Sequence, residues 1–120
     1  MQKLAENSGR PVYFALIPTA AEIWKDWLPA GGVSYDQAAL IRSTQQGNAS
    51  FVDILGQLEC HSGKEIFYRT DHHWTSLGAY YGYRAVMEAM GREPKSISEY
   101  SPRTVSRAFN GTLYSTSGIH

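Results

Sequence analysis

The segment from Thr75 to Met90 constrains the fold most, because its pattern is that of a single helix with two different faces. Thr75 suits the N-cap position, and Gly91 suits the left-handed position that follows a helix. At about 100° per residue, a line of small residues runs beside a line of bulkier ones. The small line is Gly78, Gly82, Ala85 and Ala89, and the bulky line is Ala79, Tyr83, Val86 and Met90. Each interior glycine costs about 1 kcal/mol relative to alanine. We therefore expect this helix to pack closely against a sheet.

Strand-like and helix-like segments alternate along the rest of the chain. Val12–Ile17 is a continuous apolar run, typical of a parallel strand covered on both faces. Thr19 and Glu22 have the spacing of a capping box. The patterns predict strands at 12–17, 50–55 and 66–69. They predict the end of a helix at 2–6, stopped by Ser8-Gly9, and helices at 20–27 and 35–46, the second stopped by Gly47-Asn48. A helical turn is expected at 56–62 and an irregular segment at 95–120. This order predicts a three-layer α/β fold with a small, mainly parallel sheet.

Length and composition narrow the class of protein. A chain of 120 residues is long enough for one core but not for two, so we expect a single domain over 1–120. Lys and Arg number eleven and Asp and Glu also eleven, without a basic block, which argues against a nucleic-acid partner. Residues 1–9 are polar and lack the apolar centre of a signal peptide. If the protein is exported, we expect its signal to lie upstream or to have been removed.

Cysteine and tryptophan side chains at three positions are candidates for a functional role. Cys60, the only cysteine, excludes an internal disulfide. We expect it to be a small buried thiol rather than a metal ligand together with His61. Trp24 and Trp27 are expected to pack a short helix against the sheet, with a platform for stacking sugars as the alternative.

The run Asp71-His72-His73-Trp74 concentrates an acid, two imidazoles and an indole in four consecutive positions. It follows a predicted strand and precedes the helix that starts at Thr75. In α/β sheets, ligands bind at the carboxyl ends of strands. On an extended segment the side chains of Asp71 and His73 point to the same side, and that of His72 to the other.

Three interpretations of this motif are open. In the first, Asp71 orients His73 as the general base for a serine nucleophile in acyl transfer. In the second, Asp71, His72 and His73 hold a metal, with His61 or His120 assisting, although adjacent histidines on a strand point apart and no known ligand spacing is present. In the third, the cluster is purely structural. Spacing alone does not decide among them.

The chain resembles the DHHW family, which is named for the tetrapeptide found here at 71–74. Further blocks occur in family order. They are Ile17-Pro18-Thr19-Ala20-Ala21-Glu22-Ile23, Leu28-Pro29-Ala30-Gly31, Ser34-Tyr35-Asp36-Gln37, Tyr68-Arg69-Thr70, Thr75-Ser76-Leu77-Gly78-Ala79-Tyr80-Tyr81, Gly111-Thr112-Leu113-Tyr114-Ser115 and Ser117-Gly118. That family is similar to SGNH-like hydrolase and acyltransferase domains of cell-envelope proteins that O-acetylate exported polysaccharides such as alginate.

The resemblance implies roles for two residues, Asp71 as the acid and His73 as the base of a catalytic triad, with His72 in a variable position. It implies no metal and no organic cofactor, and it implies a glycan as the substrate. In the relatives the nucleophilic serine follows later, in a Gly-Asp-Ser or similar block that this chain lacks. The serines available here are Ser76, Ser96, Ser98, Ser101, Ser106, Ser115 and Ser117, none of which has the sequence of a nucleophile elbow.

We therefore expect a partial SGNH-hydrolase-like domain, inactive on its own, from an acetyltransferase or esterase located at the cell envelope or outside the cell. The alternative is a non-enzymatic envelope module that binds a polysaccharide or a protein and keeps a vestigial Asp–His pair. A sheet without its remaining strands leaves an unpaired edge and uncovered apolar surface, so we also expect self-association.

Overall fold

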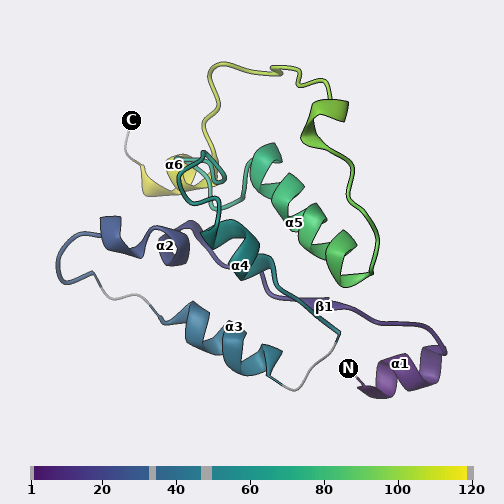
Figure 1. Ribbon diagram of the computed structural model, residues 1–120. Helices are drawn as coiled ribbons and strands as arrows, with labels where there is room; N and C mark the ends of the chain where they lie inside the picture. Colours follow the sequence, from purple (N-terminus) through teal and green to yellow (C-terminus); the bar gives the residue numbers. More distant parts are fainter. Residues whose placement is uncertain (1, 33–34, 47–49, 119–120) are drawn as a thin grey trace.

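The computed structural model describes residues 2–32, 35–46 and 50–118 and has three layers around a very small sheet (Figure 1). Strands β1 (Phe14–Ala15) and β2 (Phe51–Val52) pair in parallel, with Phe14 opposite Phe51 and Ala15 opposite Val52. Helix α3 (Gln37–Gln45) covers one face, and helices α4 (Ile54–Glu59) and α5 (Ser76–Ala89) cover the other. The α/β class and the small parallel sheet are confirmed.

Side-chain alternation along the strands explains why helices cover both faces. Phe14 and Phe51 meet edge to face at 5.7 Å and pack with Ile41 of α3. Ala15 and Val52 point the other way, into a cluster with α4 and α5. Each face of a two-stranded sheet is too small to form a core alone, so the helices supply most of the buried apolar surface.

The strands are shorter than the sequence predicts. The predicted strand at 50–55 ends after Val52, because the Asp53 carboxylate accepts a hydrogen bond from the Gly56 amide at 3.0 Å and caps α4. The helix predicted from residue 56 thus begins at Ile54. The predicted third strand at 66–69 is reduced to an antiparallel bridge between Phe67 and Trp74.

The helix predicted at 20–27 is split into α2 (Ala20–Ile23) and a 3₁₀ helix, η1 (Lys25–Trp27). Its predicted capping box does not form, because both side chains bind Gln37 instead. The Glu22 carboxylate accepts from the Gln37 amide at 2.9 Å, and the Thr19 hydroxyl accepts from the Gln37 side-chain amide at 2.8 Å. These bonds join α2 to the first residue of α3. The Asp36 carboxylate caps α3, accepting from Ala39, so α3 starts two residues later than expected, and its predicted stop at 47–48 lies outside the described residues.

Helix α5 matches the prediction to within one residue at each end. The Thr75 hydroxyl accepts from the Gly78 amide, and Gly91 has a positive φ of 65°. A Cβ atom at Gly78 would overlap the Ile66 carbonyl, and one at Gly82 would lie 2.8 Å from the Trp74 ring. The close approach predicted from the two glycines is therefore present, but it is made to Trp74 and Ile66 rather than to a sheet.

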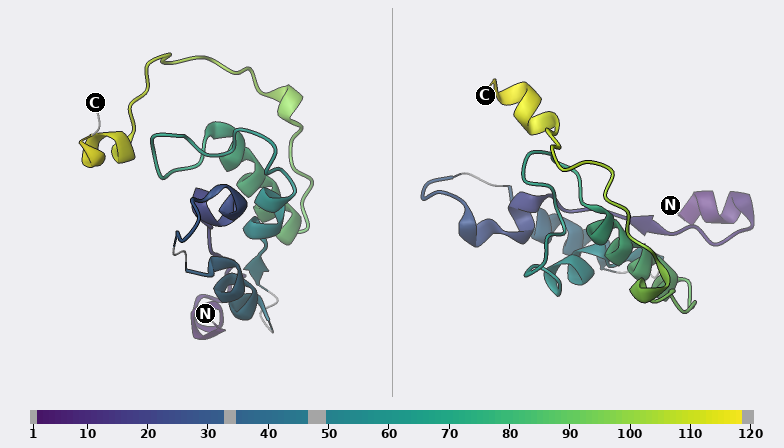
Figure 2. Two further views of the ribbon diagram at one scale, coloured as in Figure 1. Left: turned by 90° about the vertical axis from the view of Figure 1, so that its left-hand side faces the viewer. Right: turned by 90° about the horizontal axis from the view of Figure 1, so that it is seen from above.

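The terminal segments extend away from the layered centre (Figure 2). Helix α1 (Gln2–Ser8) ends at the predicted Ser8-Gly9 stop, and Gly9 has a positive φ. The segment predicted as irregular contains two short helices, η2 (Ile97–Glu99) and α6 (Thr112–Ser117). Residues 101–110 between them are exposed. None of the described helices combines the length and the apolar content required to cross a bilayer.

Candidate active site

A closed loop at residues 68–73 carries the acid and both imidazoles. At its base, Phe67 and Trp74 form the antiparallel bridge, and the Tyr68 amide donates to the His73 carbonyl at 3.2 Å. The Thr75 amide donates to the Ile66 carbonyl at 2.9 Å, which fixes the start of α5 against the loop. The loop therefore has its two ends anchored to buried residues, as a functional loop on a rigid scaffold requires.

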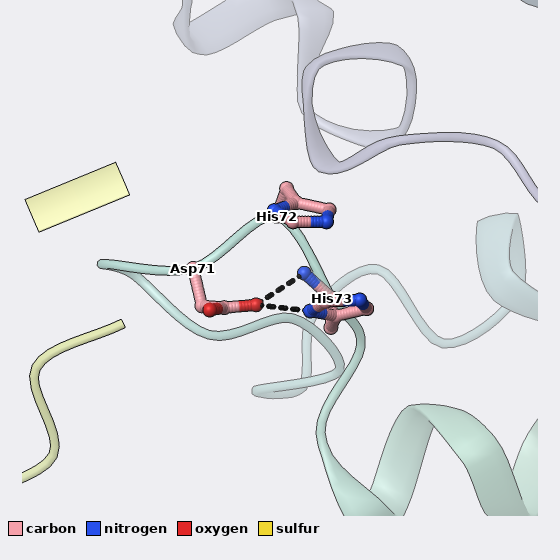
Figure 3. A group of neighbouring side chains, drawn as sticks. All are labelled: Asp71, His72 and His73. Carbon is pink, nitrogen blue, oxygen red and sulfur yellow. Dashed lines mark hydrogen bonds and ion pairs between the residues drawn. The ribbon is translucent and has the colours of Figure 1, made fainter. Parts of the chain in front are cut away.

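Asp71 and His73 meet within this loop (Figure 3). Asp71 Oδ1 lies 2.5 Å from His73 Nδ1 and accepts a second hydrogen bond from the His73 backbone amide at 2.8 Å. The Asp71 side chain is 7% exposed, whereas that of His73 is 64% exposed. Among the described residues nothing is hydrogen-bonded to His73 Nε2. An imidazole held at Nδ1 by a buried carboxylate, with Nε2 open, has the geometry of a general base.

The second oxygen of Asp71 is held by a residue 41 positions later in the chain. Asp71 Oδ2 accepts from the Thr112 amide at 2.8 Å and from the Thr112 hydroxyl at 3.0 Å. The amides of Thr112 and His73, followed by their side chains, stabilise the charged carboxylate and hold the pKa of Asp71 well below its usual range, although burial opposes the shift. Sequence reasoning missed Thr112. Its only signal was membership of the Gly111–Ser115 block, to which no role was attached.

His72 does not point away from its neighbours as an extended segment would require. The chain bends at 71–73, and the His72 and His73 ring centroids lie 3.9 Å apart. His72 Nδ1 contacts the Thr112 hydroxyl oxygen at 2.8 Å. The expectation that the two histidines face opposite sides is therefore wrong. The rings lie close together because the His73 amide donates back to Asp71 Oδ1, and this bond turns the chain out of the extended geometry.

The same bend brings together the three candidate metal ligands. One ligand atom each from Asp71, His72 and His73 can be chosen within 4.8 Å of one another. Both oxygens of Asp71, however, already accept hydrogen bonds, and Nδ1 of each histidine has a partner. The geometric objection to a metal is removed, but an ion bound through Asp71 would have to displace these donors. Of the two suggested helpers, His61 stacks instead on Tyr81 at 3.6 Å, and His120 lies outside the described residues.

No serine in the described part of the chain is hydrogen-bonded to His73. Ser76 starts α5 and lines a groove of about 630 Å³ together with Tyr80, Tyr83 and Tyr100. Ser96 caps η2, and Ser115 Oγ donates to the Gly111 carbonyl at 3.1 Å. The structure thus brings the acid and the base together without a serine as the third member.

The predictions for Cys60, Trp24 and Trp27 have different outcomes. Cys60 is exposed, so its expected burial is wrong, because it caps the surface end of α4. Trp24 packs as expected: its ring meets Phe67 edge to face, and its Nε1–H donates to the Ser62 carbonyl at 2.8 Å. Trp27 lies parallel to Trp24 at 5.8 Å and is 78% exposed, so only one of the two tryptophans has the expected packing role.

Comparison with known proteins identifies the family of this chain. The sequence profile of the family described as SGNH hydrolase-like domain, acetyltransferase AlgX matches residues 1–118. The crystal structure of a DHHW family protein from Eubacterium siraeum is similar over 97% of this chain, with a TM-score of 0.76 and 31% sequence identity. This chain spans 39% of the length of that protein. No curated protein sequence matches. The chain belongs to the SGNH hydrolase-like domain family of the acetyltransferase AlgX, a family of acyltransferase and esterase type, and is similar in structure to a DHHW protein.

Proposed function

We propose that the protein containing this chain transfers or removes an acyl group, specifically acetyl, on an exported glycan at the cell envelope. The observation that carries the proposal is the hydrogen bond between Asp71 and His73 Nδ1. It leaves Nε2 of a largely exposed ring without a hydrogen-bond partner among the described residues. The family match supports the acyl chemistry. The AlgX-type resemblance supports the glycan substrate and the envelope location.

In the proposed mechanism, His73 Nε2 removes the proton of a serine hydroxyl as the serine oxygen attacks the ester carbonyl. Asp71 keeps the Nδ1–H tautomer and stabilises the imidazolium that forms. The imidazolium returns its proton to the leaving alcohol, and the acyl group stays on the serine. A glycan hydroxyl or water, deprotonated by the same Nε2, then attacks the acyl carbonyl and takes the acyl group. The bond from the acyl carbon to the serine oxygen breaks, and the imidazolium returns the proton to that oxygen. The serine comes from a part of the protein outside the described residues.

Trp27 supports a glycan as the partner. Its ring is exposed and stacks on the anchored ring of Trp24 with 6° between their planes. A rigid exposed indole presents a flat apolar surface to the C–H face of a pyranose ring at little entropic cost.

The test is ester hydrolysis by the complete protein that contains this chain. We expect His73→Ala to lower kcat by about 10²- to 10⁴-fold, the usual contribution of a general base. The control is His61→Ala, because that imidazole contacts Tyr81 and the Gln57 carbonyl rather than Asp71. Unchanged turnover in His73→Ala, with the fold intact by circular dichroism, would reject His73 as the base.

A second candidate function is a glycan-binding module with a vestigial Asp–His pair. The observation favouring it is that no serine reaches His73 within 2–32, 35–46 and 50–118. The complete protein separates the two candidates. An esterase activity that depends on His73 supports the enzyme, whereas glycan binding without any esterase activity supports the module.

A further inference from the structure

The Asp71 carboxylate is held in part by a segment that is remote in sequence. Helix α6 follows the exposed stretch 101–110 and reaches the site loop from one side (Figures 1 and 2). Its contacts there are made to Thr70, Asp71 and His72. The Gly111 amide donates to the Thr70 hydroxyl at 3.2 Å, and the Tyr114 amide donates to the Thr70 carbonyl at 3.2 Å. The start of α6 is therefore bound to the residues that carry the acid.

Thr112 makes the two contacts that reach the carboxylate itself. A hydroxyl has one proton to donate and lone pairs to accept with. Because the Thr112 hydroxyl donates to Asp71 Oδ2, it can only accept from His72, so His72 Nδ1 must be the donor in that contact. The hydroxyl thus adds one donor to the carboxylate and requires a proton on Nδ1 of the neighbouring His72.

Gly111 shows that this close approach is built into the chain. A Cβ atom at position 111 would overlap the Asp71 Cβ and lie 2.7 Å from Asp71 Oδ2. The φ of Gly111 is −83°, which any residue can adopt, so backbone conformation is not the reason for glycine here. Only the absence of a side chain lets the Thr112 amide come within 2.8 Å of the carboxylate.

We propose that Thr112 is a positioning residue for the Asp71–His73 pair: it holds Oδ2 so that Oδ1 faces His73 Nδ1. The catalytic consequence rests on the proposed function, but the geometric claim does not. Without the hydroxyl, one donor to Oδ2 is lost, the carboxylate is freer to rotate about χ2, and the fixed bond to His73 Nδ1 weakens.

The experiment compares Thr112→Val, Thr112→Ser and Thr116→Val. Valine removes the hydroxyl at nearly constant volume, and serine restores it. Thr116 lies on the same short helix, but its hydroxyl donates to the helix carbonyls of Thr112 at 2.8 Å and Leu113 at 3.4 Å. It therefore controls for loss of a threonine hydroxyl from α6.

The first readout is the ¹H–¹⁵N resonance of His73 Nδ1–H in this 120-residue chain, measured by NMR. We expect a hydrogen-bonded resonance in the unaltered chain, in Thr112→Ser and in Thr116→Val. In Thr112→Val we expect it to move toward the position of a solvent-exposed imidazole or to broaden by exchange. A resonance in Thr112→Val that matches the unaltered chain would overturn the proposal. If the valine variant does not fold, Thr112→Ala is read by the same criterion.

The second readout is kcat for ester hydrolysis in the complete protein. We expect Thr112→Val to lose about 10- to 100-fold, the size seen when an orienting partner of a ligand histidine is removed, and Thr112→Ser to recover most of it. If His73→Ala keeps full activity, the proposed function fails while the NMR comparison still decides the role of Thr112. If His73→Ala is inactive but Thr112→Val has unchanged kcat, Thr112 has no positioning role.

Discussion

Four N–H and O–H donors surround the Asp71 carboxylate, two from His73 and two from Thr112. They hold its pKa below the unfolded value of about 3.9. A carboxyl group whose pKa is lower in the folded state stabilises the fold at pH values above its pKa in the unfolded chain. This contribution is lost as the pH falls toward the pKa of the folded state. We therefore expect Asp71→Asn to lower Tm at pH 7, and the difference from the unaltered chain to shrink between pH 5 and pH 2. Thermal unfolding followed by circular dichroism measures both.

The control for this prediction is Asp26→Asn on η1, since no hydrogen bond of the Asp26 carboxylate is seen in the described part of the chain. Its Tm difference should stay small and nearly constant over the same range. A deficit of Asp71→Asn that is as large at pH 2 as at pH 7 would contradict a stabilising carboxylate.

Helix α5 fixes the site loop through the two glycines that face Trp74. An alanine at Gly78 would collide with the Ile66 backbone carbonyl, which cannot move without opening the base of the loop. Overpacking of this kind costs about 1–3 kcal/mol, and the better helix propensity of alanine offsets only about 1 kcal/mol. We expect Gly78→Ala to lower the free energy of unfolding, measured in urea, and Gly82→Ala to do so by less, because the Trp74 ring can shift. Gly63→Ala is the control, with no atom within 4 Å of the added Cβ and an expected change within about 0.5 kcal/mol. Equal stability of Gly78→Ala and Gly63→Ala would show that the close approach of Gly78 to the Ile66 carbonyl does not affect stability.

Elements whose signals are local were predictable, and those decided by distant partners were not. Helix α5 has its cap, its periodicity and its stop within one segment, so its bounds were predicted to within one residue. The capping box at Thr19 failed because Gln37, 18 residues away, offers both side chains better partners. The prediction of a third strand failed because residues 68–73 form a loop, and Phe67 therefore pairs with Trp74 at the base of that loop.

In the candidate site, too, the local contact was predictable and the distant one was not. The Asp71–His73 contact spans two residues and follows from local spacing, although the chain reaches it through a bend rather than an extended strand. The Thr112 contact spans 41 residues and depends on where α6 docks, for which a single sequence gives no physical signal. The roles of Asp71 and His73 in catalysis stay predictions.

The molecule as a whole is more open than a compact domain of its length. Its radius of gyration is 16.7 Å, against about 14 Å expected for 120 residues. Exposed large side chains include Ile17 beside β1, at 53%, and Leu4 on α1, at 55%. Both strands of a two-stranded sheet are edge strands, which offer unpaired backbone groups to another chain.

We therefore expect this chain to self-associate through the sheet, with a mass above 13.4 kDa in light scattering that rises with concentration. Ile17→Lys places a charge beside β1 and should shift the population toward monomer, because a buried lysine next to a strand edge opposes pairing. Leu4→Lys adds the same charge at a similarly exposed position on α1, away from the sheet, and should leave association unchanged. A monomeric mass at the highest attainable concentration would contradict self-association. Equal effects of the two lysines would place the contact elsewhere than at the sheet.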